Sequence, residues 1–176
     1  MLPSDSTLRQ GHVLVIGVDG VRYDLLGPDT APCVRGLGAA GFLGPVPVDE
    51  ATPTWSGPCW ATIATGTGVA GHGVTGNDLT GHRLADHPDF VTLATRAGLP
   101  TLLAVRSRPP GSGENWTIVV VTDHGHLDEG GHGGREPEVA TAWAASAGHG
   151  IRPGAPPLIT RQEQVAPLVL AAAGWS

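Results

Sequence analysis

Two short apolar runs stand out in the chain, and each ends in an aspartate. Residues 12–18 (HVLVIGV) and 116–122 (WTIVVVT) are almost wholly apolar and rich in β-branched side chains. Runs of this length and composition are typical of strands that are buried on both faces. Asp19 ends the first run and Asp123 ends the second. A weaker run at residues 101–105 predicts a further strand.

Five segments have the apolar spacing or the flanking residues that are typical of helices. They are residues 22–26, 30–40, 59–64, 88–97 and 162–173. Pro58 suits a first helical position, and Gly98 and Pro100 follow the end of the fourth segment. Strands and helices in this order predict an α/β protein, with a mostly parallel central sheet and helices on both faces. The 176 residues fit a single domain that spans residues 1–176.

Side chains that suit a metal follow both predicted strands. Both predicted strands end in an aspartate, which indicates chemistry at the carboxyl edge of a sheet. The candidate residues there are Asp19 and the pair Asp123-His124. A carboxylate beside an imidazole suits zinc or manganese. The simpler alternative for each is a turn residue or a helix cap. His132 lies among glycines that let the backbone fold tightly, and its alternative is a residue of a mobile surface loop.

A candidate nucleophile lies in residues 52–66 (TPTWSGPCWATIATG), where hydroxyl side chains occupy a Gly/Pro turn before a helix. The amino end of a helix offers N–H groups and a positive dipole to an incoming phosphate. A metal bound to such a hydroxyl lowers its pKa and activates it as a nucleophile. The alternative is a serine or threonine that only caps the helix.

Charge and composition narrow the classes of function. The formal net charge is −6, and the ten basic residues, all arginine, form no run, which argues against nucleic-acid binding. No apolar stretch is long enough to span a membrane, and residues 1–10 lack the apolar core of a secretion signal. Two cysteines, Cys33 and Cys59, make no disulfide framework. A cytoplasmic protein is the expectation.

Five motifs occur in a characteristic order along the chain. They are VDG at residues 18–20, TWSGPCWATIATG at 54–66, GHGVTGN at 71–77, TDHG at 122–125 and GGHGG at 130–134. This order resembles the alkaline phosphatase superfamily and, within it, the type I phosphodiesterase/nucleotide pyrophosphatase group. The resemblance extends from Val13 to the last predicted helix. It implies an alkaline phosphatase-like fold in a shortened form.

The resemblance also implies a site with two divalent metal ions, usually zinc. The residues at the positions of the family's ligands to one metal are Asp19, Ser56, Asp123 and His124, and His132 matches a ligand of the other.

Further roles follow from the same resemblance. Ser56 stands at the position of the nucleophile, with Thr54 as its rival. Asn77 stands where the family places an asparagine that holds a phosphate oxygen, and a structural role is expected for His72. The implied substrate is a small phosphorylated molecule. The sequence gives no indication of the oligomeric state.

The chain departs from the family pattern between Asn77 and the TDHG motif. The family supplies two further ligands of the other metal there, spaced Asp-x-x-x-His, whereas residues 102–116 contain neither Asp nor His. The polar segment 106–114 replaces a longer family segment, which indicates an internal deletion. Residues 86–89 (DHPD) contain suitable atoms but resemble an ordinary helix start, and Asp78 is a weaker substitute. The chain therefore has the family's ligands for one metal and an incomplete set for the second.

These observations predict a metal-dependent phosphoester hydrolase. Ser56 would attack phosphorus to form a phospho-enzyme that water then hydrolyses. A sulfatase is less favoured because residues 56–60 (SGPCW) lack the arginine of the sulfatase motif. The main alternative is a degenerate relative that binds one metal or a phosphorylated ligand with little turnover, because loss of one electrostatic contact costs on the order of a hundredfold to a thousandfold in rate. A further alternative is that a segment near residue 106 is missing from this chain.

Overall fold

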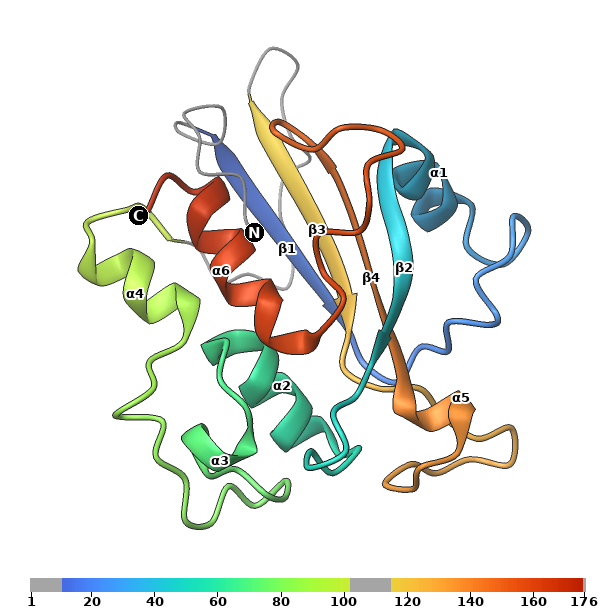
Figure 1. The fold of residues 1–176 in the computed structure, drawn as a ribbon, viewed down its shortest axis with the longest axis vertical. Coiled ribbons are helices and arrows are strands. Elements are labelled where there is room, and N and C mark those ends of the chain that lie inside the picture. The colour runs from blue at the N-terminus through green and yellow to red at the C-terminus, as the bar shows by residue number, and fades with distance from the viewer. Residues whose placement is uncertain (1–10, 102–114, 176) are drawn as a thin grey trace.

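The computed structural model describes residues 11–101 and 115–175, which contain four strands and seven helical segments (Figure 1). In chain order these are β1 (His12–Val18), α1 (Pro32–Ala40), β2 (Gly41–Pro47), α2 (Ser56–Thr65), α3 (Val69–His72), α4 (Phe90–Arg96), β3 (Trp116–Thr122), α5 (Pro137–Ala140), β4 (Thr141–Gly148), the 3₁₀ turn η2 (Gln162–Gln164) and α6 (Val165–Ala172). The predicted strands at 12–18 and 116–122 are present. The predicted strand at 101–105 and the proposed deletion at 106–114 lie outside the described residues, apart from Thr101, which is not in a strand.

The four described strands form one mixed sheet in the order β1-β3-β4-β2. β1 and β3 are parallel, whereas β4 is antiparallel to both of its neighbours, β3 and β2. The prediction of a mostly parallel sheet was therefore wrong, although the α/β class is correct. The two antiparallel strands have atypical compositions, because β4 (TAWAASAG) is rich in alanine and β2 (GFLGPVP) contains glycine and proline. Pro45 and Pro47 are exposed on the edge strand β2, where proline is tolerated.

β1 is more exposed than its apolar sequence predicted. Among the described residues it pairs with β3 on one side only, so it is an edge strand. Ile16 of β1 is 40% exposed, whereas Val119 and Val121 of β3 are fully or almost fully buried. The expectation that both runs are covered on both faces is correct for β3 and wrong for β1.

The side chains of β3 and β4 alternate between two apolar cores, one on each face of the sheet. On one face Val119 and Val121 pack with residues of α2 and α6. On the other face Val120 and Trp143 pack with residues of α1 and the segment before it. Figure 1 shows α2 and α6 together in front of the sheet, away from α1. Helices thus cover both faces, which explains the unbroken apolar sequence of β3.

Two helix predictions differ from the structure. Residues 22–26 form turns, because a segment of five residues before Gly27 and Pro28 is too short to sustain a helix. The predicted helix 162–173 is divided into η2 and α6. Pro167 has no N–H to donate to the carbonyl of Glu163, so regular α-helical bonding cannot extend back through this point.

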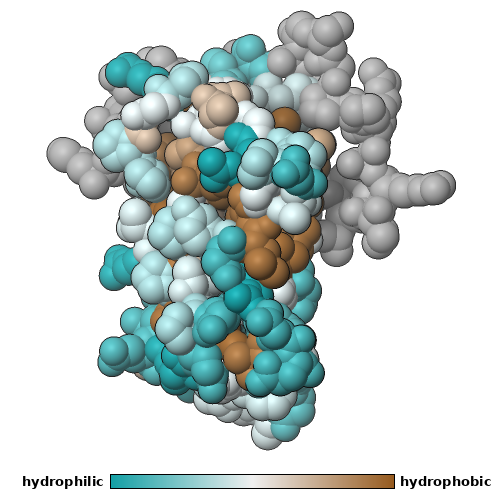
Figure 2. Space-filling view, turned by 90° about the vertical axis from the view of Figure 1, so that its right-hand side faces the viewer, coloured by the Kyte–Doolittle hydropathy of each residue, from teal (hydrophilic) through white to brown (hydrophobic). Residues whose placement is uncertain are grey.

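The surface of the side that carries α1 and β2 is hydrophilic toward one end, with apolar groups gathered nearer the middle (Figure 2). Large apolar side chains that are exposed among the described residues include Leu25, Trp55 and Leu79. None of the helices in the described part of the chain has both the length and the apolar content needed to cross a membrane.

The carboxyl ends of β1 and β3 meet the amino end of α2. Val18 pairs with Thr122 in the parallel register, so Asp19 and Asp123 leave the sheet side by side. α2 begins at Ser56 and packs on this face through Cys59 and Ile63. The sheet and one helix therefore bring together the residues that the sequence singled out.

Candidate metal centre

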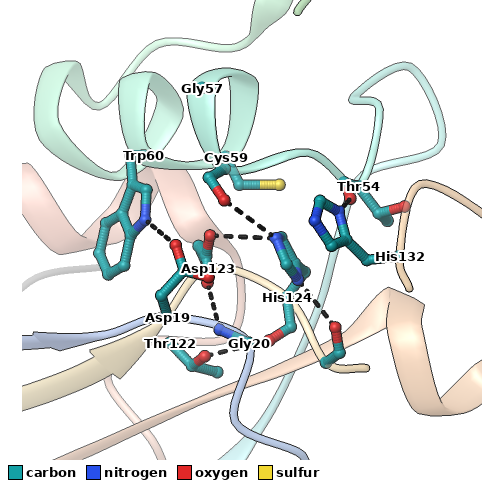
Figure 3. Close-up of polar contacts among 12 residues, drawn as sticks. Asp19, Gly20, Thr54, Gly57, Cys59, Trp60, Thr122, Asp123, His124 and His132 are labelled. Carbon is teal, nitrogen blue, oxygen red and sulfur yellow. Dashed lines mark hydrogen bonds and ion pairs between the residues drawn. The ribbon is translucent and has the colours of Figure 1, made fainter. Parts of the chain in front are cut away.

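Asp19, Asp123 and His124 form the one group of three potential metal ligands within residues 11–101 and 115–175. One ligand atom from each residue lies within 4.8 Å of the other two. Asp123 and His124 are fully buried, whereas Asp19 is exposed. Figure 3 shows the three side chains converging from the ends of β1 and β3 beneath α2. The group is therefore open to solvent on the side of Asp19.

The imidazole of His124 is oriented by the backbone next to it. Its Nδ1 lies 2.8 Å from the carbonyl oxygen of Gly125, which can only accept a hydrogen bond, so Nδ1 carries the proton. Its Nε2, which carries a lone pair in the neutral form of the ring, is 3.2 Å from Asp123 Oδ2 and 3.4 Å from Ser56 Oγ. Hydrogen bonds of this kind fix the tautomer of metal-binding histidines.

The carboxylate of Asp123 is only half satisfied by the protein. Oδ1 accepts a hydrogen bond from Gly20 N at 3.0 Å, whereas the buried Oδ2 has no hydrogen-bond partner. Burial raises the pKa of Asp123 by more than the Gly20 hydrogen bond and the neighbouring His124 lower it. With a protonated His124, Oδ2 makes an ion pair with Nε2 at 3.2 Å; with a neutral His124 the two atoms are both acceptors, and a bound cation would satisfy both. The donor set of two carboxylates and an imidazole fits a divalent metal such as zinc.

Asp19 is held from α2. Trp60 Nε1 donates a hydrogen bond to Asp19 Oδ2 at 3.2 Å. Partial burial raises the pKa of Asp19, but hydrogen bonds with Trp60 and Ser56 and the neighbouring His124 outweigh it, so the pKa lies below its ordinary value of 3.8. Asp19 is therefore ionised at neutral pH, the form that binds a metal.

Ser56 is the first residue of α2 and faces the three ligands. Its Oγ lies 3.4 Å from His124 Nε2. The rival nucleophile, Thr54, is fully buried and donates its hydroxyl to the carbonyl of Gly134 at 2.7 Å. Ser56 thus lies beside the cluster, whereas the hydroxyl of Thr54 is hydrogen-bonded to the loop that contains Gly134.

Asn77 lies next to the start of α2. Its Oδ1 accepts a hydrogen bond from Gly57 N at 2.7 Å, which leaves the amide NH₂ as the free donor. A Cβ on Gly57 would lie 2.6 Å from the carbonyl oxygen of Gly76, so the close approach of this turn requires glycine. Ser56 and Asn77 both line a groove of about 510 Å³.

His132 lies beside the cluster without belonging to the group of three. Its ring stacks on that of His124, with centroids 4.4 Å apart and planes inclined by 23°. Its Nδ1 donates to the carbonyl of Thr54 at 3.0 Å, which leaves Nε2 with a lone pair. Trp55 packs against the ring in a T-shaped arrangement, with centroids 5.3 Å apart. The position suits a ligand of a neighbouring ion.

Asp89 and Asp78, two of the possible substitutes for the absent ligands, have other roles, and so does His72. Asp89 caps the amino end of α4 by accepting two backbone N–H groups. Asp78 accepts two hydrogen bonds from Thr80 within its own turn. His72 is buried and bonded to the hydroxyl of Thr62, which is the structural role expected for it. None of them joins the metal-ligand group.

Three polar residues around the site were not found from the sequence. The first is Trp60, which contacts Asp19. The second is Gln162, whose amide donates to the carbonyl of Asp123 at 2.5 Å. The hydroxyl of Thr122 accepts from Val21 N and donates to the carbonyl of His124. Trp60 could have been found, because it lies four residues after Ser56 and hence on the same face of α2. Gln162 lies 39 residues from its partner, and no local pattern predicts that contact.

Comparisons with known proteins concern the first half of the site. The family model for type I phosphodiesterase/nucleotide pyrophosphatase matches residues 13–97, which include Asp19, Ser56 and Asn77. Asp123 and His124 lie beyond the matched range, and the parallel pairing of β1 and β3 brings them against it. Searches of curated proteins and of solved structures gave no match. Residues 13–97 are therefore similar to the type I phosphodiesterase/nucleotide pyrophosphatase family, which lies within the alkaline phosphatase superfamily.

Proposed function

We propose that this protein is a metal-dependent phosphoester hydrolase of the phosphodiesterase or nucleotide pyrophosphatase type, with Ser56 as its nucleophile. The observation that carries the proposal is the placement of Ser56 Oγ, 3.4 Å from His124 Nε2, beside the three potential metal ligands. The family match supports the class of reaction. The family is metal-dependent in general and acts on small phosphorylated substrates.

The proposed ligands of the metal are Asp19, Asp123, His124 and Ser56, with zinc as the proposed ion. When bound, the ion would lower the pKa of the Ser56 hydroxyl and offset negative charge on the phosphate.

The proposed reaction has two steps. The Ser56 hydroxyl loses its proton to solvent, Oγ forms a bond to phosphorus, and the bond from phosphorus to the leaving oxygen breaks. The leaving group takes a proton from water. A water molecule then attacks phosphorus, the bond to Oγ breaks, and Ser56 regains a proton. The Asn77 amide and the Ser56 N–H at the start of α2 can hold the non-bridging oxygens.

The groove beside Ser56 is the proposed place for the rest of the ester. It lies along α2 and reaches Asp89 at the start of α4. Its apolar lining includes Trp60, Leu79 and Leu84. A leaving group with some apolar surface fits these walls better than a small polar alcohol does.

The experiment is a paired measurement on the purified full chain. Metal content per chain is determined, and release of nitrophenol from bis- and mono-nitrophenyl phosphate is followed with added zinc or manganese. We expect Ser56→Ala to lower the rate by about a thousandfold or more. Thr95→Ala, which removes an exposed hydroxyl on α4, is the matched control and should retain the rate. Equal rates in Ser56→Ala and the wild type would assign the hydrolysis to something other than Ser56.

One observation favours a second candidate. The described residues offer one group of three ligands, and residues 102–116 contain no Asp or His to complete another. The chain would then bind one metal or a phosphorylated ligand with little turnover. Two metals per chain together with Ser56-dependent hydrolysis supports the hydrolase. One metal per chain, with a rate of hydrolysis no higher than that of the Ser56→Ala control, supports the candidate that binds its ligand with little turnover.

A sulfatase-type mechanism, with a modified cysteine, has less support. Cys59 is fully buried, and its thiol lies 3.5 Å from the carbonyl of Pro53. Burial raises the pKa of this thiol to about 12. Cys59 is thus an apolar core residue of α2 rather than a reactive group.

A further inference from the structure

The two candidate carboxylate ligands are held in different ways. Asp123 is buried, and a backbone N–H from Gly20 fixes its Oδ1. Asp19 is exposed at the end of the edge strand β1. An exposed aspartate exchanges among several rotamers, and it loses this freedom when it binds a metal. A group that restrains Asp19 in advance would therefore affect how tightly the metal binds.

Trp60 is placed to supply that restraint. Its Nε1 donates to Asp19 Oδ2 at 3.2 Å, as Figure 3 shows. Trp60 lies one helical turn after Ser56, so both side chains reach the cluster from one face of α2. The hydrogen bond therefore ties the proposed ligand at the end of β1 to the helix that carries the proposed nucleophile.

The indole ring is itself fixed by close packing on β1. A Cβ on Gly17 would lie 2.8 Å from Cη2 of Trp60 and 3.1 Å from Cζ3. Gly17 thus leaves the space in which the ring lies against the strand, two residues before Asp19. A donor on a rigid ring in a fixed place directs the carboxylate more firmly than a donor on a flexible side chain does.

We propose that Trp60 is a positioning residue, whose indole N–H orients the Asp19 carboxylate for binding a divalent metal. The inference rests on the metal-dependent function proposed above. Partners that orient metal ligands in this way commonly change metal affinity by about 10- to 100-fold.

Trp60 has a second contact that the test must keep apart from the first. Its ring lines the groove beside Ser56, so deletion of the whole side chain would alter both the groove and Asp19. Trp60→Phe removes the N–H donor and keeps a smaller aromatic ring, but the atoms that lie on Gly17 belong to the six-membered half of the indole. A second measurement that leaves Trp60 in place therefore separates the hydrogen bond from the packing.

The first measurement is zinc affinity, obtained with the full chain by competition against a chromophoric chelator at one pH. We expect Trp60→Phe to bind zinc 10- to 100-fold more weakly than the wild type. Trp175→Phe is the matched control, because Trp175 is 41% exposed and lies outside the group of ligands, and its affinity should stay within about twofold. Unchanged affinity in Trp60→Phe would overturn the proposal while leaving the metal site intact. A wild type that binds no zinc would overturn the proposed function as well, so the two failures are distinguishable.

The second measurement needs no change at Trp60. The chain has five tryptophans, and ¹⁵N-labelled protein gives one indole N–H resonance for each. We expect zinc to shift one of these resonances, the same one that shifts in Asp19→Asn. If the indole that responds to Asp19→Asn ignores zinc in a wild type that binds it, Trp60 does not position this ligand.

Discussion

Replacement of Asp123 by asparagine should stabilise the metal-free protein. In the wild type, Asp123 Oδ2 is buried without a hydrogen-bond partner and faces His124 Nε2 at 3.2 Å. In the neutral form of His124 with its proton on Nδ1, Nε2 is an acceptor as well. An asparagine would keep its Oδ1 on the Gly20 N–H and turn an NH₂ donor toward the lone pair of His124.

The magnitude follows from the unsatisfied group. A buried polar atom without a partner costs about 1–3 kcal/mol, so Asp123→Asn should raise the free energy of unfolding of the metal-free chain by about that amount. In a chain of this size 1 kcal/mol corresponds to about 2–4 °C in Tm, which gives a rise of roughly 2–12 °C. The same change removes a ligand and should abolish stabilisation by metal.

Thermal unfolding followed by circular dichroism, first with a chelator and then with zinc, tests both effects. At free zinc about 100 times Kd, the wild type should gain about 2.7 kcal/mol and the variant nothing, so zinc should cancel or reverse the difference in stability. Asp29→Asn, at an exposed position, should change neither value. A variant that melts below the wild type in chelator would refute the reasoning, because Asp123 would then be satisfied without a metal.

Three further predictions concern residues around the site. Burial lowers the pKa of His72 from its ordinary 6.5, and its neutral ring accepts a hydrogen bond from Val74 N. As the pH falls, His72 is therefore protonated in the unfolded chain before it is protonated in the folded protein. The contribution of His72 to the free energy of unfolding should be complete above pH 6.5 and decline as the pH falls below that value. Urea unfolding measured from pH 8 to pH 5 should show a smaller decline in His72→Asn than in the wild type. Native protein should react with iodoacetamide at the exposed Cys33 and not at Cys59, whose pKa of about 12 reflects burial, and peptide mass spectrometry that finds equal labelling would contradict this. Gly57→Ala should lower the free energy of unfolding by about 1–3 kcal/mol and reduce kcat/KM, because the added Cβ would lie 2.6 Å from a carbonyl oxygen. If the variant has the free energy of unfolding and the kcat/KM of the wild type, the turn can move to make room.

The parts of the fold that were predictable are those with a strong local pattern. β3 has a continuous run of β-branched residues because both of its faces are covered, and that pattern is visible in the sequence. β4 was missed because its alanines favour helices when considered alone. Its strand conformation comes from pairing with β3 and β2, and several of its alanines are fully buried there. Such pairing is non-local, so it overrides intrinsic preference without leaving a local signal.

The candidate site was more predictable than the sheet around it. Asp19 and Asp123 could be paired from sequence because each follows a strand, and this needs only the one parallel pair, β1 and β3, to be correct. The contacts of Trp60 and Gln162 could not be predicted with the same ease. They depend on how α2 and η2 pack against the sheet, which no single segment encodes.

The pairing of β1 with β3 also has a kinetic consequence. Gly20 and Asp123, which are joined by a hydrogen bond at the site, lie 103 residues apart in the chain. A metal held by Asp19 and Asp123 would act as a removable cross-link between these distant segments that, unlike a disulfide, is absent from the unfolded chain. Because its ligands come together only after the two strands have paired, the ion should slow unfolding and leave the rate of folding almost unchanged. Chelation would then shorten the lifetime of the folded protein without delaying its formation.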